Sequence, residues 1–230
     1  MVLSGRGQFQ WRFGGLLRYA LELSGASRPK LCFLNTATGD DDTRLRACYG
    51  AAAGEQVEAS HVALFPMPNV EDVRAHLLAQ DVIWVGGGSV ANLLALWRVH
   101  GLDTVMREAF EGGVVLAGVS AGSLCWHTGG TTDSFGPELS PVTNGLGLVP
   151  YGNGVHYDSE PQRRPLLQHL VATGVLPRSY ATEDGVGLHY VGTEMREAVA
   201  ELPGRRAYRI EPDGNGGVVE TALSTRLLDY

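Results

Sequence analysis

Residues 112–127 read GGVVLAGVSAGSLCWH, and they contain the clearest evidence for the fold class. The apolar run at 114–117 lies between glycines and shows no alternation of polar and apolar residues. Such a run predicts a strand that is buried on both faces, as central strands of parallel sheets are. A glycine-bounded turn at 118–122 follows, and then a helical pattern over 123–127. A strand that turns directly into a helix is typical of an α/β fold.

Strand-length apolar runs alternate with helical patterns through the first two thirds of the chain. This alternation predicts βαβ units and a largely parallel sheet with helices on both faces. The expected strands cover 2–4, 30–35, 57–65 and 81–85, and the expected helices cover 11–23, 43–53, 70–79, 89–100 and 102–111. Beyond residue 130 the pattern is looser, with a strand-like stretch at 145–150, a helix near 161–172, a strand at 186–192 and a C-terminal β-hairpin over 206–223. Because no repeat or linker interrupts the chain, we expect residues 1–230 to form a single domain.

The composition limits the partners and the compartment. The net charge is −7, and the few basic residues form no sustained stripe, so we expect no nucleic-acid partner. No apolar run reaches the length of about 20 residues that spans a bilayer, and the first residues do not resemble a secretion signal. Three widely spaced cysteines are typical of a reducing compartment. We therefore expect a cytoplasmic protein, either a monomer or a homodimer.

The turn Gly118-Val119-Ser120-Ala121-Gly122 matches the pattern G-x-S-x-G between a strand and a helix. A serine on such a turn has strained backbone geometry, and small residues must flank it so that strand and helix approach closely. Its hydroxyl then stands above the sheet, where backbone N–H groups can receive an oxyanion. The pattern also occurs by chance in glycine-rich chains, but its position between strand and helix favours Ser120 as a nucleophile.

A serine nucleophile needs a base and an acid that orients the base. Among the seven histidines, His156 lies in a polar loop, whereas His127 falls about two helical turns beyond Ser120 and His189 alternates within a strand. We therefore interpret His156 as the base. The acid stays open at this point, and the candidates are Asp133, Asp158, Glu160, Glu183, Asp184 and Glu194.

Two further motifs contain residues of chemical interest. Gly86-Gly87-Gly88 ends a strand and opens a helix without the lysine of a phosphate-binding loop, so it favours an oxyanion donor. The acidic run Asp40-Asp41-Asp42 has the composition of a cation site, but is more typical of a helix start. We expect no metal and no cofactor.

Several motifs together resemble the peptidase E family, the aspartyl dipeptidase-like serine peptidases that include cyanophycinases. The motifs are VGGGS at 85–89, GVSAGS at 118–123, TTDS at 131–134, HYDSEPQR at 156–163 and EDGVGL at 183–188. Their order and spacing match the family over most of the chain. The resemblance implies a fold like that of the class I glutamine amidotransferases and a serine peptidase that cleaves short peptides through an acyl-enzyme.

The resemblance also implies roles for particular residues. It points to a triad in the order Ser120, His156 and Asp184, with the adjacent Glu183 as the fallback acid. The oxyanion donors implied are the backbone N–H groups of Gly88 and Ala121.

One position departs from the family. Aspartyl dipeptidases of this family hold the substrate's aspartate with an arginine shortly after the catalytic histidine, and here Glu160 aligns with that arginine. Arg163 or Arg164 is close enough in sequence to substitute for it. The resemblance therefore implies the peptidase activity, whereas specificity for an N-terminal aspartate does not follow from it.

Two other functions fit the same residues. An esterase or other amide hydrolase could use the same triad, or could use His189 as base with Asp133 or Glu160 as acid. A non-catalytic amidotransferase-like binding module would instead leave Ser120 unreactive.

Overall fold

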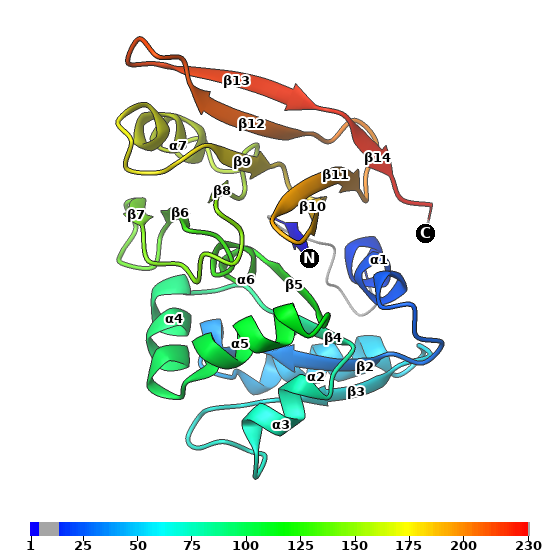
Figure 1. Ribbon diagram of the computed structural model, residues 1–230. Helices are drawn as coiled ribbons and strands as arrows, with labels where there is room; N and C mark the ends of the chain where they lie inside the picture. The colour runs from blue at the N-terminus through cyan, green and yellow to red at the C-terminus, as the bar shows by residue number, and fades with distance from the viewer. Residues whose placement is uncertain (5–13, 230) are drawn as a thin grey trace.

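The computed structural model describes residues 1–4 and 14–229, which form two β-sheets with helices packed against them (Figure 1). Within these residues the first sheet has eight strands. In spatial order they are β14 (Thr225–Leu227), β11 (Glu194–Ala200), β10 (Val186–Val191), β1 (Val2–Ser4), β5 (Val115–Val119), β4 (Val82–Val85), β2 (Lys30–Leu34) and β3 (Glu58–His61).

The first sheet is largely parallel, as predicted. Strands β1, β5, β4, β2 and β3 run parallel to one another, and β10 and β11 add antiparallel pairs at the other side of β1. The carboxyl ends of β2, β4 and β5 therefore meet at one edge, which is where ligands bind in open α/β sheets. The Gly86-Gly87-Gly88 loop and Ser120 both lie at this edge.

Helices cover both faces of the first sheet. They are α1 (Gly15–Leu23), the 3-10 turn η1 (Thr36–Thr38), α2 (Asp42–Ala52), α3 (Val73–Leu78), α4 (Val90–Val99), α5 (Leu102–Glu111) and α6 (Ala121–Leu124). A further helix, α7 (Arg163–Ala172), packs against the second sheet. In β2, Leu31 and Phe33 pack with α1 and α2, whereas Cys32 and Leu34 pack with α3, α4 and α5. Successive side chains thus fill two separate cores. No helix among the described residues is long and apolar enough to cross a membrane.

The second sheet is the main feature that the sequence did not predict. Its strands, in spatial order, are β13 (Val218–Leu223), β12 (Ala207–Pro212), β9 (Ser179–Thr182), β8 (Gly152–Gly154), β6 (Gly129–Thr132) and β7 (Ser140–Val142). Only the hairpin of β12 and β13 was expected, and the antiparallel pairing of Pro212 with Val218 confirms it. The other strands have three or four residues, and β6, β8 and β9 are buried throughout, so no period of two marks them.

Several predicted elements differ at their ends, among them the helix predicted over 70–79, which begins at Val73. Residues 11–13 of the predicted helix lie outside the described residues, and α1 begins at Gly15. The strand predicted over 57–65 is shorter, since β3 ends at His61. Beyond it, the backbone N–H groups of Leu64 and Phe65 donate to the Asp40 carboxylate and not to a neighbouring strand. The helix predicted over 123–127 is wrong beyond Leu124.

That helix does not continue in α form, because the N–H groups of Trp126 and His127 donate to the carbonyls three residues back, those of Ser123 and Leu124. The carbonyls of Cys125 and Trp126 accept hydrogen bonds from the N–H groups of Leu146 and Leu148. The chain then turns into β6, so His127 is not on the helix of Ser120.

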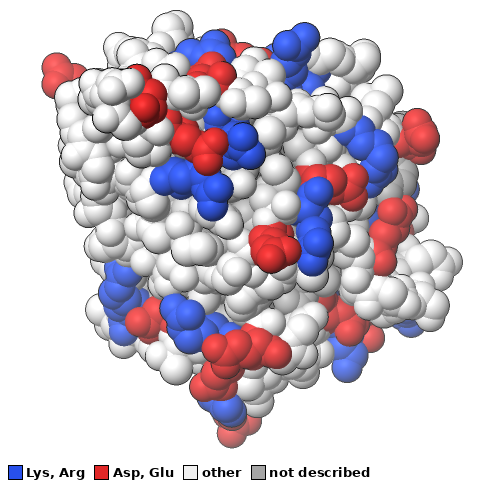
Figure 2. Space-filling view, turned by 45° about the horizontal axis from the view of Figure 1, so that its top comes forward, with Lys and Arg blue, Asp and Glu red and all other residues white. Residues whose placement is uncertain are grey.

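Charged side chains are interspersed on the surface. On the face shown in Figure 2, lysine and arginine lie beside aspartate and glutamate, with uncharged surface between the groups. Neighbouring opposite charges cancel each other's field at a distance. This face therefore lacks the continuous basic surface that nucleic-acid binding uses.

Candidate active site

Ser120 lies on the turn between β5 and α6. Its backbone has φ 54° and ψ −116°, a region that residues with a side chain rarely adopt. Strain of this kind persists only where the surrounding structure imposes it, and it is concentrated at functional sites. The turn leaves Ser120 partly exposed above the carboxyl edge of the sheet.

Two glycines allow this turn to form. A Cβ atom on Gly118 would lie 2.3 Å from the Gly122 carbonyl oxygen, and one on Gly122 would lie 2.2 Å from the Val85 carbonyl oxygen. Both obstacles are backbone atoms of neighbouring elements, so a side chain cannot be accommodated by a rotamer change. The sequence prediction that small residues must flank Ser120 is thus explained by the packing of β4, β5 and α6.

We expect Gly122→Ala to lower the free energy of unfolding by about 3 kcal/mol or more. The added methyl group would press against the Val85 backbone and force α6 away from β4. Urea-induced unfolding measures this change. Gly50→Ala is the matched control, since Gly50 is exposed in α2 with nothing within 4 Å of its added Cβ. There the same substitution should stabilise the protein by about 0.5–1 kcal/mol. Equal effects at both positions would contradict this explanation of the turn.

His156 contacts Ser120 directly. Its Nε2 lies 3.0 Å from Ser120 Oγ, within hydrogen-bond distance. His156 follows β8 and has φ 56°, and its side chain is only 7% exposed. The loop that contains His156 therefore places the ring beside Ser120, and the backbone of His156 is held in a strained conformation.

Asp184 completes a chain of two hydrogen bonds. Its Oδ1 lies 2.8 Å from His156 Nδ1, the ring nitrogen that does not face Ser120. Asp184 lies on the turn between β9 and β10. Strand β9 pairs with β8, the strand that His156 follows. Three segments that are far apart in the sequence thus meet at the carboxyl edge.

The neighbouring Glu183 faces another way. Its carboxylate accepts hydrogen bonds from the Tyr208 hydroxyl at 2.7 Å and from the Arg206 N–H at 2.9 Å. Both donors belong to β12 or the residue before it. Of the two adjacent acids, the structure therefore brings Asp184, and not Glu183, into contact with His156.

The other acids weighed from the sequence have different surroundings. The Oδ1 atom of Asp158 accepts the backbone N–H of Asp184 at 2.9 Å, and its Oδ2 pairs with Arg205. Asp133 is 62% exposed and lies 3.9 Å from the guanidinium of Arg163. The contact between Asp158 and Asp184 was not foreseen, although Asp158 stands two residues after His156 in the polar motif.

The two rival histidines are engaged elsewhere. His189 has its Nδ1 2.8 Å from the Tyr19 hydroxyl and 3.7 Å from Glu197, beside α1. His127 is fully buried, with its Nδ1 2.9 Å from the Ser123 carbonyl oxygen. Burial lowers the pKa of His127 to about 4, so it is neutral at pH 7. The geometry thus disfavours an esterase that uses His189 as its base.

The glycine loop after β4 lies against Ser120. A Cβ atom on Gly87 would be 3.0 Å from Ser120 Cβ, which shows how closely the two loops approach. Gly88 has φ +141°, and a Cβ there would lie 2.3 Å from the Ala37 carbonyl oxygen. Ala121 is buried at the start of α6. The glycine loop thus approaches Ser120 through Gly87, and Ala121 follows Ser120 directly in the chain.

Glu160 and Arg163 form a charged pair next to the His156 loop. The Glu160 N–H donates to the His156 carbonyl oxygen at 3.1 Å, and the Glu160 carboxylate accepts from Arg163 Nε at 2.7 Å. Arg163 is buried and also donates to the Thr131 carbonyl oxygen. With Asp133 nearby, one guanidinium lies between two carboxylates, so this cluster has one negative charge in excess.

Arg164 faces the C-terminal hairpin. Its guanidinium pairs with Glu220 at 2.6 Å and stacks over the rings of Tyr157 and Tyr208, at 4.9 and 4.7 Å from their centroids. These contacts hold α7 against β12 and β13.

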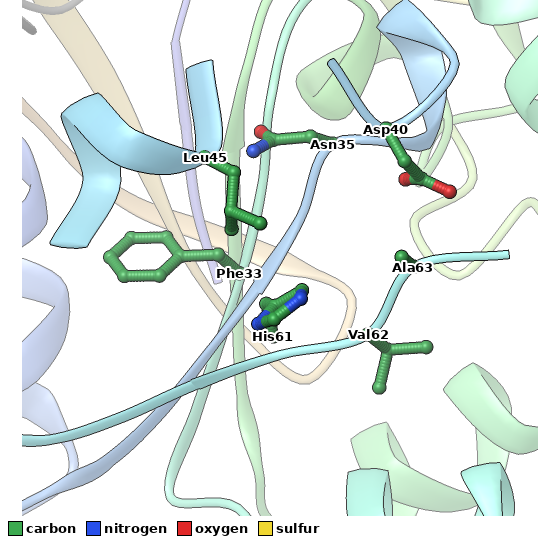
Figure 3. Close-up of a pocket in the computed structure, with 7 residues that line it drawn as sticks. All are labelled: Phe33, Asn35, Asp40, Leu45, His61, Val62 and Ala63. Carbon is green, nitrogen blue, oxygen red and sulfur yellow. The ribbon is translucent and has the colours of Figure 1, made fainter. Parts of the chain in front are cut away.

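The acidic run begins α2, as its composition suggested. Asp41 caps the helix by accepting the Arg44 N–H, and Asp42 lies in the first turn. Asp40 turns inward and lines a small hollow with His61 at the carboxyl ends of β2 and β3 (Figure 3). Among the described residues, no group of three or more histidine, cysteine, aspartate or glutamate side chains is placed to hold a metal ion.

Solved structures of similar fold include two peptidases. A crystal structure of a peptidase from an acI-B1 Actinobacterium superposes with a TM-score of 0.69, at 16% identity, over 97% of this chain and 93% of that chain. A putative peptidase E of Listeria monocytogenes EGD-e superposes with a TM-score of 0.54, at 16% identity, over 97% of this chain and 98% of that one. At such identities the likeness shows the α/β fold that these proteins share.

Sequence comparison identifies the family. The uncharacterized peptidase YgaJ of Bacillus subtilis is 39% identical over 193 residues, which cover 84% of this chain and 83% of that protein. A peptidase E of Streptomyces coelicolor is 32% identical over 154 residues, which cover 64% of this chain and 60% of that protein. The family model described as "Peptidase family S51" matches residues 1–198. The chain therefore belongs to peptidase family S51 and is a serine-type peptidase.

Proposed function

We propose that Ser120, His156 and Asp184 are the catalytic triad of a peptidase that hydrolyses short peptides, in the manner of a dipeptidase. One observation supports this most: two hydrogen bonds, of 3.0 and 2.8 Å, join the serine hydroxyl, the imidazole and the carboxylate in an unbroken chain. The strained turn at Ser120 and the glycine loop beside it support the same proposal.

Each residue has a defined part in the proposed mechanism. His156 Nε2 takes the hydroxyl proton while Ser120 Oγ attacks the carbonyl carbon of the peptide bond. The oxyanion that forms accepts hydrogen bonds from the backbone N–H groups of Gly88 and Ala121. His156 then gives its proton to the leaving amine, and an acyl-enzyme remains on Ser120. Water, deprotonated by His156, hydrolyses that ester and regenerates the serine.

Asp184 acts through His156. A carboxylate that accepts the Nδ1–H holds the imidazole in the tautomer with a free Nε2 and stabilises the imidazolium as it forms. This chemistry is complete with side chains and backbone of the chain itself, so we propose that it uses no metal and no cofactor.

For the substrate, we propose that Glu160 and Arg163 border the site of the N-terminal residue and disfavour an acidic side chain there. Glu160 lies one turn beyond His156, and Arg163 reaches β6 on the other side. Arg163 is already held by Glu160 and Thr131, and Arg164 by Glu220, so neither guanidinium is available to a substrate carboxylate. The excess negative charge of the cluster opposes a further carboxylate.

We expect Asn-Leu to be a better substrate than Asp-Leu, since the two dipeptides differ mainly in charge. Like charges about 4 Å apart repel by about 1 kcal/mol even in water, which corresponds to about fivefold in kcat/KM. Glu160→Gln should narrow the difference, and Glu160→Arg should reverse it. Steady-state kinetics with both dipeptides measure the ratio.

Glu111→Gln, at the exposed end of α5, is the control for a general effect of charge. It should leave the ratio unchanged. A wild-type preference for Asp-Leu that survives Glu160→Gln would show that Glu160 does not border the substrate. Absence of hydrolysis with every dipeptide would instead contradict the proposed activity.

We also propose that the protein acts in the cytoplasm as a monomer or homodimer, without a nucleic-acid or membrane partner. The three cysteines are all buried and form no disulfide, which suits a reducing compartment. Size-exclusion chromatography with light scattering tests the oligomeric state, and a larger assembly would contradict the proposal.

A further inference from the structure

The contact between His156 and Asp184 joins two separate loops. His156 follows β8, and Asp184 follows β9, so the length of their hydrogen bond depends on how the loops are held together. His156 has a strained backbone, which relaxes if its neighbours release it. Contacts between the two loops, in addition to the one between His156 and Asp184, are therefore needed to hold this geometry before substrate binds.

Asp158 supplies a second connection between the same loops. Its Oδ1 accepts the backbone N–H of Asp184 at 2.9 Å. The segment 156–158 therefore contacts Asp184 twice, through the His156 ring to its carboxylate and through the Asp158 carboxylate to its backbone. Two hydrogen bonds at different atoms limit both the position and the rotation of Asp184, which one bond alone does not.

Arg205 holds Asp158 in place. The Arg205 guanidinium pairs with Asp158 Oδ2, and the Arg205 carbonyl oxygen accepts the Thr225 hydroxyl at 2.7 Å. The guanidinium is placed to offset the repulsion between Asp158 and Asp184, which otherwise would drive the two carboxylates apart. The residue that follows, Arg206, anchors Glu183 through its N–H. The two residues before β12 thus hold the turn at 183–184, Arg205 through Asp158 and Arg206 through Glu183.

We propose that Asp158, held by Arg205, is a positioning residue that keeps the Asp184 carboxylate aligned on His156. It touches no reacting atom and acts through Asp184 alone. The inference rests on the triad proposed above. Its consequence is that loss of Asp158 reduces turnover while substrate binding is retained.

The first test is Asp158→Ala. We expect kcat to fall by roughly 10- to 100-fold, because a displacement of about 1 Å in a catalytic group costs up to about 10²-fold. KM should stay within about threefold, since Asp158 is outside the proposed substrate site. Asp158→Asn keeps an oxygen that accepts the Asp184 N–H, so its loss should be clearly smaller.

Asp81→Ala is the matched control. Asp81 Oδ2 also accepts a backbone N–H, that of Lys30 at 2.7 Å, but at the amino ends of β2 and β4. It should leave kcat unchanged. Arg205→Gln should reproduce part of the Asp158→Ala loss, and Arg205→Lys, which keeps the charge, should restore turnover.

A double-mutant cycle separates positioning from general stability. In an Asp184→Asn background, Asp158→Ala should cost less than about twofold in kcat, because the group that it positions is already disabled. A full loss in that background, or a loss in Asp158→Ala explained by unfolding in a thermal melt, would overturn the proposal. No loss in Asp158→Ala would overturn it too.

Failure of the triad itself gives a different result. If Ser120→Ala and Asp184→Asn both retain turnover, the proposed triad is wrong. If those variants lose turnover while Asp158→Ala keeps it, the triad stands and only the positioning role fails.

Discussion

Ser120→Ala should lower kcat/KM for dipeptides on the order of 10⁴-fold or more, with the fold intact. The members of such a triad act as a unit, so removing the nucleophile removes the covalent route altogether. Alanine keeps the small size that the turn between Gly118 and Gly122 requires, and Ser120 packs no apolar core. Steady-state kinetics with a purified variant measure the loss.

The control for this substitution is Ser123→Ala. Ser123 lies in α6, is fully buried and donates to the side chain of Asn153, so it is a neighbouring serine without access to substrate. Ser123→Ala should lower the free energy of unfolding more than Ser120→Ala does. It should lower kcat/KM far less than Ser120→Ala does. Activity of Ser120→Ala within tenfold of the wild type would exclude Ser120 as nucleophile.

Asp184→Asn should lower kcat on the order of 10⁴-fold, because an amide does not stabilise the imidazolium and favours the wrong tautomer. Glu183→Gln is a nearly isosteric change at the adjacent residue. It should stay within roughly tenfold, since Glu183 contacts Tyr208 and Arg206 and not the imidazole, and its loss only loosens the turn.

The ranking of the two variants is the informative result. A larger loss in Glu183→Gln than in Asp184→Asn would transfer the acid's role to Glu183. Small and equal losses in both would show that neither acid orients His156 and would direct attention to Asp133 or Asp158. We do not expect Asp184→Glu to keep the turnover of the wild type, because the extra methylene moves the carboxylate against a ring that is already 2.8 Å away.

The serine turn could be predicted from sequence because its requirements are local. A buried strand, two glycines and a serine within residues 114–122 specify a tight strand-to-helix connection whatever the rest of the chain does. His156 could be selected because catalytic groups lie on loops at the sheet edge. His127 was set aside for the wrong reason, since the helix that would have carried it ends at Leu124 and the ring is instead buried.

The choice of acid could not be made from local pattern alone. Glu183 and Asp184 are adjacent and both polar. The direction of each side chain depends on partners more than 20 positions away, namely Arg206 and Tyr208 for Glu183 and His156 for Asp184. The resemblance pointed to Asp184, and the geometry places it at His156. The buried position of Arg163 was equally hidden, because it depends on the pairing of α7 with the unpredicted strand β6.

If Ser120 is a nucleophile activated by His156, it should react covalently with a fluorophosphonate probe. Intact mass and peptide mapping of the treated protein measure this reaction. We predict one adduct per chain on Ser120, no adduct in Ser120→Ala, and labelling slowed by at least about 10²-fold in His156→Ala. An enzyme that hydrolyses dipeptides while Ser120 stays unlabelled would contradict this role of Ser120. Absence of both labelling and hydrolysis would instead indicate a non-catalytic binding module.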